Sequence, residues 1–86
     1  MKIIIKPHTL EQAQERGATE AEIIETIIDG ERFDAKDGRL GSAKVFEFNS
    51  LWKGKFHEEK RIEVIFVEQN NQLITVTVYS YYGKWK

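Results

Sequence analysis

The chain has 86 residues, 13 of them basic and 14 acidic, and a formal net charge of −1 at pH 7. This length predicts a single domain, residues 1–86, with one modest core. Because 41% of the residues are hydrophobic and none is cysteine, the composition argues against a disordered chain, a disulfide framework and a thiolate metal site. The balanced charge gives no general attraction to nucleic acid, so RNA binding would need a local basic patch. No apolar run approaches the roughly 20 residues that span a bilayer, and we expect a soluble cytoplasmic protein with no membrane partner.

The first expected element is a short β-strand, KIIIK at residues 2–6. Pro7 ends it, because proline cannot donate to a sheet ladder. The following segment, TLEQ, favours a helix with Thr9 at the N-cap and Gln12 at N3. Gly17 suits the left-handed position that closes this helix.

A second helix is predicted directly after the first. The segment TEAE places Thr19 at the N-cap and Glu22 at N3, which is the pattern of a capping box. Isoleucines at positions 23, 24, 27 and 28 then form one apolar stripe at helical spacing. Gly30 follows the last turn and is expected to end the helix.

From residue 31 onward the pattern changes from helix to strand. A short strand is expected at residues 32–35, another in KVFEFNS, and a connection or frayed hairpin loop around Gly54. RIEVIFVE and QLITVTVYSY are the most regular strands. Between them, Asn70 and Asn71 tolerate the positive φ of a two-residue hairpin turn.

That turn predicts a register for the hairpin. One side of the hairpin is mostly aliphatic and is expected to pack against the second helix: Glu63, Ile65, Val67, Ile74, Val76 and Val78. The other side mixes apolar, hydroxyl and basic groups, as a ligand-facing surface would: Lys60, Ile62, Val64, Phe66, Thr75, Thr77, Tyr79 and Tyr81. The predicted fold class is α+β, with two N-terminal helices packed on one face of a three- to five-stranded, mainly antiparallel sheet in the order β-α-α-β-β-β.

His8 and Arg16 are candidate catalytic residues in the first helix. His8 lies at the helix entrance, where backbone N–H groups attract phosphate and the helix dipole disfavours imidazolium, so it could act as a base. The alternative is that His8 only continues the N-terminal turn. Arg16 lies seven residues after Thr9 on the same helix face, and it could flank the same anion as His8. Its alternative role is to complement the helix dipole at the C-terminus.

The remaining candidates lie in the second half of the chain. His57 falls in a charged segment typical of a solvated loop, and no metal-ligand spacing or cofactor motif is present, so neither a metal nor a cofactor is expected. In the final stretch, TVYSYYGKWK, Tyr79 and Tyr82 could pack in the sheet or position a nucleotide. Lys84 and Trp85 could neutralise phosphate and stack on a base, or cover the end of the core.

Three segments together, KPHTLEQAQERGATEAEIIETIIDGE, KRIEVIFVE and NNQLITVTVYSYYGKW, resemble a family of short bacterial proteins described as a domain of unknown function. That family is grouped with RelE-like and barnase-like ribonucleases, many of them toxins of toxin–antitoxin pairs. The resemblance spans nearly the whole chain. It implies helices against a curved antiparallel sheet and metal-independent RNA cleavage, in which a base takes the ribose 2′-OH proton and cations stabilise the phosphate. The positions it carries over are His8, Arg16, Lys60 and the segment 77–79, whereas Tyr82 and Lys84 are added on chemical grounds.

Two functional hypotheses follow. In the first, the protein is a small metal-independent ribonuclease or toxin that acts on RNA and pairs with an antitoxin-like protein, and His8, Arg16 and Lys60 converge on one face. In the second, it is a non-catalytic module that binds another protein or forms a homodimer. The contact would then use the hairpin side that mixes apolar and polar groups and the exposed edge of the strand at residues 44–50.

Overall fold

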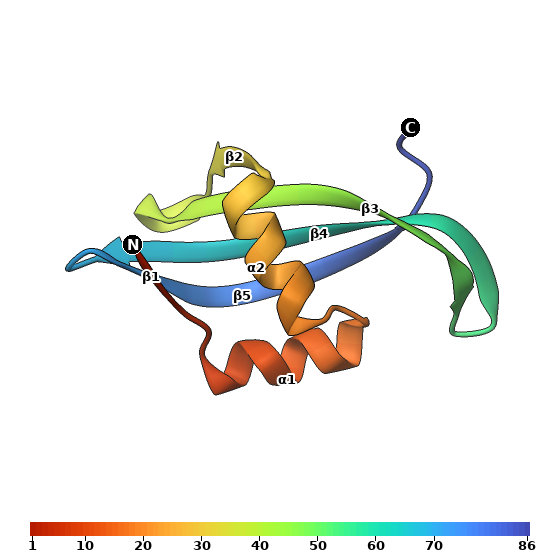
Figure 1. Cartoon of the computed structure of the whole chain (residues 1–86), viewed down its shortest axis with the longest axis horizontal. Coiled ribbons are helices and arrows are strands. Elements are labelled where there is room, and N and C mark those ends of the chain that lie inside the picture. Colours follow the sequence, from red (N-terminus) through yellow and green to blue (C-terminus); the bar gives the residue numbers. More distant parts are fainter.

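The computed structural model describes residues 1–86 and contains two α-helices and a five-stranded sheet (Figure 1). In chain order the elements are β1 (Lys2–Ile4), α1 (Pro7–Arg16), α2 (Glu20–Asp29), β2 (Glu31–Asp34), the short 3₁₀ turn η1 (Lys36–Gly38), β3 (Leu40–Trp52), β4 (Lys55–Gln69) and β5 (Gln72–Gly83). The sheet order is β1-β5-β4-β3-β2, in which β1 runs parallel to β5 and all other neighbours are antiparallel. The predicted α+β class and element order are confirmed.

Helix α1 begins three residues earlier than the sequence pattern indicates. Pro7 occupies its first turn and Lys6 is the N-cap, without a side-chain capping bond. The prediction of Thr9 as N-cap is therefore wrong: Thr9 is buried, and its hydroxyl accepts a hydrogen bond from the Thr75 hydroxyl at 2.9 Å. Proline favours this earlier start, because the N–H groups in the first turn of a helix have no intrahelical acceptor, so the N–H that proline lacks is not needed there. Gly17 closes α1 at a φ of 79°, as predicted.

Helix α2 has the predicted capping box. The Thr19 hydroxyl accepts from the Glu22 backbone N–H at 3.1 Å, and the Glu22 carboxylate accepts from the Thr19 N–H at 3.0 Å. Of the isoleucine stripe, Ile23 and Ile27 are buried in the core, whereas Ile28 is 65% exposed. Thus α2 packs through one side only, and its first turn carries the acidic residues that suit a helix N-terminus.

Both long hairpins end in two-residue turns of positive φ. Asn70 and Asn71 form the predicted turn between β4 and β5. Lys53 and Gly54 form the turn between β3 and β4. The segment around Gly54, expected to be a connection or frayed loop, is therefore a continuous hairpin that projects beyond the helices (Figure 1).

The register of the β4–β5 hairpin follows the prediction only near its turn. Val67 pairs with Ile74 as expected, but Ile65 pairs with Thr77 where Val76 was predicted. Because Phe66 pairs with Thr75, Val76 is an extra residue in β5, which is a β-bulge. Every pairing beyond it is shifted by one residue.

The bulge decides which side chains of β5 lie under the helices. On β4 and β5 the core residues are Ile62, Val64, Phe66, Leu73 and Val78. Val78 of β5, which was predicted on the packing surface of the hairpin, lies in the core as expected. The predicted packing surface is wrong for β4, since strand alternation places Ile65 and Val67 on the opposite side. We call that side of the sheet, which carries no helix, the open face; it presents three cross-strand pairs, Arg61–Tyr81, Glu63–Tyr79 and Ile65–Thr77.

The two neighbouring isoleucines of α2 give a matched test of this packing. Ile27→Ala is expected to lower the free energy of unfolding by about 2–4 kcal/mol, because it leaves a cavity under the helix. Ile28→Ala is expected to change it by less than about 0.5 kcal/mol, since that side chain is in solvent. Urea denaturation of both variants measures the difference, and equal effects would contradict the described orientation of α2.

Candidate functional site

One stripe of α1 faces the edge of β5. His8, Gln12 and Arg16 recur every four residues and so lie along the same side of the helix. The side-chain oxygen of Gln12 accepts hydrogen bonds from the Thr77 hydroxyl at 2.7 Å and from the Val78 N–H at 3.4 Å. The Arg16 guanidinium donates to the Val78 carbonyl. His8, in the first turn, is exposed.

The end of β1 explains why α1 makes these bonds. β1 pairs only with residues 72–74 of β5, so Val78 lies at an edge where no strand continues. Val78 is nonetheless fully buried, and buried backbone groups need partners. Gln12 and Arg16 supply an acceptor and a donor in place of a neighbouring strand, which fixes both side chains against β5.

Arg16 also lies over an exposed aromatic ring. Its guanidinium carbon is 5.2 Å from the centroid of the Tyr79 ring, and Tyr79 is 40% exposed. A cation over the face of an aromatic ring is attracted by the ring quadrupole. The ring and the Val78 carbonyl together hold the Arg16 head group at the margin of the open face.

A cavity of about 330 Å³ opens beside Tyr79. Its lining residues come from the loop that contains η1 and from the open face: Ala35, Lys36, Asp37, Arg39, Ile65, Thr77 and Tyr79. Asp37 adopts the left-handed conformation, with a φ of 60°. Lys36, Arg39 and the nearby Arg16 form no ion pair with a carboxylate. The lining of the cavity therefore carries Lys36 and Arg39 against the carboxylate of Asp37, and the margin at Tyr79 adds Arg16 and, across the ladder, Glu63.

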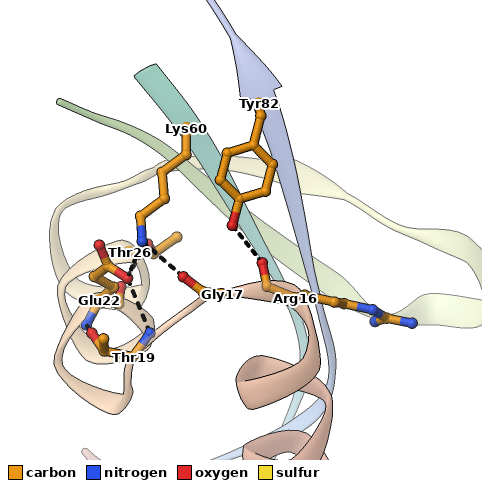
Figure 2. A network of polar contacts seen from close by, with 7 residues as sticks. All are labelled: Arg16, Gly17, Thr19, Glu22, Thr26, Lys60 and Tyr82. Atoms are coloured by element: carbon orange, nitrogen blue, oxygen red, sulfur yellow. Dashed lines mark hydrogen bonds and ion pairs between the residues drawn. The ribbon is translucent and has the colours of Figure 1, made fainter. Parts of the chain in front are cut away.

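Lys60 lies at a different place, the junction between α1 and α2 (Figure 2). Its ammonium group donates to the Gly17 carbonyl at 2.8 Å and forms an ion pair with the Glu22 carboxylate at 2.9 Å. The ring of Phe48 lies 5.2 Å from the same nitrogen. Only 7% of the Lys60 side chain is exposed, so its ammonium group contacts the helix junction and not a ligand on the surface.

Tyr82 supports the same junction from β5. Its hydroxyl donates to the Arg16 carbonyl at 2.6 Å (Figure 2). Its ring stacks on Trp52 at a centroid distance of 4.9 Å. A Cβ at Gly17 would collide with both Tyr82 and Trp52, so this turn requires glycine for space as well as for its φ. Burial, together with the carboxylate of Glu22, raises the pKa of Tyr82, which keeps the phenol protonated and able to donate.

Lys84 and Trp85, the last two predicted site residues, lie at neither place. Lys84 is exposed and pairs with Glu58 at 3.4 Å. The backbone N–H groups of Trp85 and Lys86 both donate to one carboxylate oxygen of Glu59, at 2.6 and 3.0 Å. These two bonds lower the pKa of Glu59. They hold the end of the chain against β4.

The structure thus brings together only part of the predicted site. Arg16 and Tyr79 are in contact, and His8 lies on the same stripe of α1. The side chains of Arg16 and Lys60 point away from each other (Figure 2), and Lys84 does not line the cavity. Three further residues of the site, Gln12, Lys36 and Arg39, were not singled out from the sequence.

The described geometry is that of a small α+β domain with a cationic and aromatic cavity on the open side of its sheet. Comparison with family models matches residues 5–80 to DUF4258, a domain of unknown function. The chain belongs to this family, in agreement with the resemblance noted in its sequence. Comparisons with curated proteins and with solved structures give no significant match. No helix is both long and apolar enough to span a membrane.

Two lysines with very different surroundings test the role of the helix junction. Lys60→Met is expected to lower the free energy of unfolding by about 2–3 kcal/mol, because Glu22 and the Gly17 carbonyl lose their partner in a largely buried place. Lys84→Met removes an exposed ion pair and should cost less than about 0.5 kcal/mol. Urea denaturation gives both values. A small effect at Lys60 would contradict the structural role assigned to it.

Proposed function

We propose that the protein is a metal-independent ribonuclease of the RelE-like and barnase-like kind, and that it acts where α1 meets the open face. The observation that carries this proposal is the Arg16 guanidinium, which is held over Tyr79 beside a cavity with two further cations, Lys36 and Arg39. The match to a family of unknown function agrees with the family part of the sequence resemblance, and the grouping of that family with RNA-cleaving proteins is part of this proposal.

The cations of this site suit a phosphodiester. The guanidinium of Arg16 has five N–H donors, of which the bond to Val78 uses one, so others remain for phosphate oxygens. Lys36 and Arg39 add charge from the loop that lines the cavity. An exposed tyrosine ring offers a surface on which a base can stack, so Tyr79 would hold the nucleotide attached to that phosphate.

Cleavage without a metal uses the ribose itself as the nucleophile. A base removes the proton of the 2′-OH, whose oxygen attacks the adjacent phosphorus; the bond to the 5′ oxygen breaks, and a proton from the protonated base or from water completes the leaving group. The products are a 2′,3′-cyclic phosphate and a 5′-hydroxyl. His8 is the proposed base, because it is an exposed histidine on the stripe of α1 that carries Arg16. About 12 Å of helix axis separates the two residues, so the proposal requires their side chains to approach each other when RNA binds. Arg16 stabilises the charge that develops on the phosphate, whereas Lys60 contributes by holding the helix junction.

RNA cleavage in the presence of EDTA tests this assignment. Wild type is expected to cleave single-stranded RNA, His8→Ala to be slower by about 10²–10⁴-fold, and Arg16→Ala by about 10²–10³-fold. His57→Ala and Glu15→Ala are matched controls, since one removes the other histidine and the other an exposed neighbour on α1. Circular dichroism of each variant checks that the fold is intact.

Either of two results would reject the proposal. One is the absence of cleavage by wild type, and the other is cleavage at equal rates by wild type, His8→Ala and Arg16→Ala. In the second case, contaminating nuclease or a site elsewhere on the protein would be the source of activity.

A second candidate function is that of a non-catalytic module that binds a protein partner. The free edge of β3 favours it: β2 pairs with β3 only as far as Ala43, which leaves the rest of that strand without a neighbour on this side. At the end of the same hairpin, Leu51 and Phe56 face each other and are 67% and 55% exposed. Unpaired strand edges and exposed apolar pairs are typical of protein contacts.

Light scattering tests the self-associating form of this candidate. If wild type self-associates, its molar mass is expected to rise with concentration. Leu51→Lys is expected to remain monomeric, because the lysine charge opposes burial of the hairpin end. A constant monomeric mass for wild type would contradict self-association. The remaining form of this candidate would then be binding to a different protein, such as an antitoxin-like partner.

A further inference from the structure

Two tyrosines lie next to each other on the open face of β5. Tyr79 and Tyr81 are separated by one residue, and their ring centroids are 6.5 Å apart with an interplanar angle of 30°. They are 40% and 46% exposed. Tyr82, the residue after Tyr81, points to the opposite side of the strand. There its ring stacks on Trp52 and its hydroxyl donates to the Arg16 carbonyl at the helix junction.

The surroundings of Tyr81 are charged and ordered. Across the ladder it faces Arg61, which forms an ion pair with Glu63 at 3.0 Å. Glu63 in turn lies opposite Tyr79. Burial and the Glu63 carboxylate raise the pKa of Tyr81, so its phenol remains neutral at physiological pH. Thus a second flat, uncharged ring and a guanidinium lie directly beside the ring that Arg16 covers.

Packing against the helical core does not account for these two rings, which contact each other and, at Tyr79, the Arg16 guanidinium. The core formed by the helices lies on the other side of the sheet, and no helix covers the open face. Exposed aromatic rings in series beside cations are the arrangement that binds successive bases of a single strand, since each base offers a flat face to one ring. A duplex cannot use it, because its bases are already stacked on one another.

We propose that Tyr81 forms a second stacking subsite next to Tyr79, so that the site binds single-stranded RNA over at least two adjacent nucleotides. This inference rests on the proposed function of the same site and adds to it the form and minimal length of the substrate. Tyr79 holds one base beside the cavity, Tyr81 holds its neighbour along β5, and Arg61 lies next to the phosphate that follows.

Isothermal titration with oligouridines tests the subsite. The probes are 2′-O-methyl uridine mono-, di- and tetranucleotides, in which the methyl group blocks cleavage, and a fully paired 2′-O-methyl RNA duplex. For wild type we expect the affinity to rise by about tenfold from the mononucleotide to the dinucleotide, the gain typical of one stacked base. Tyr81→Ala should abolish this gain and leave mononucleotide binding unchanged, whereas Tyr81→Phe, which keeps the ring, should retain it.

The controls separate this inference from the proposed function. Phe56→Ala removes an equally exposed ring at the far hairpin end and should keep the dinucleotide gain. The same gain in Tyr81→Ala as in wild type would overturn the subsite while leaving the ribonuclease proposal in place, as would duplex binding that depends on Tyr81. Absence of binding by wild type to any single-stranded probe would overturn the subsite and the proposed function together.

Discussion

The extra residue in β5, Val76, is the constraint on which the rest of the structure depends. Without it, strand alternation would continue unbroken, and the side chains that face the helices near the turn would share a face with Thr77 and Tyr79. The bulge reverses the alternation, so that Leu73 and Val78 both enter the core although they are separated by an odd number of positions. Since β1 ends before this point, the edge of β5 that follows is left for the side chains of α1.

Arg16 connects the fold to the candidate site. Its carbonyl accepts from Tyr82 at the helix junction, and its guanidinium donates to Val78 at the edge of the sheet. The Lys60–Glu22 ion pair completes the junction and fixes where α1 ends. A polar network that serves stability thereby positions a cation at the margin of the open face. Lys36 and Arg39 in the cavity and Arg16 at its margin form no ion pair with a carboxylate, whereas Lys60, which holds the helices, is paired with Glu22.

Local chemistry explains what could be predicted from the sequence. The capping box at Thr19 and the Asn70–Asn71 turn depend on neighbouring residues alone, and both are confirmed. The face of the hairpin could not be predicted, because β4 has aliphatic residues on both sides and the bulge has no local signature. Arg16 and Tyr79 were identified as candidates, but Lys36 and Arg39 were missed, since their place depends on how their loop folds over Ile65. Lys60 was predicted to be a catalytic residue, and nothing in the sequence showed that it lies at the helix junction with Gly17 and Glu22 as its partners.

The central claim is that ligands meet the protein where α1 joins the open face. An NMR titration of ¹⁵N-labelled protein with a 2′-O-methyl RNA tetranucleotide, recorded to include the arginine side-chain N–H resonances, tests it most directly. The account predicts that the Arg16 Nε–H and the backbone signals of Thr77, Tyr79 and the loop at residues 35–39 shift together and saturate. Shifts confined to β3 and the hairpin end at residues 51–56, or no shifts at all, would contradict it.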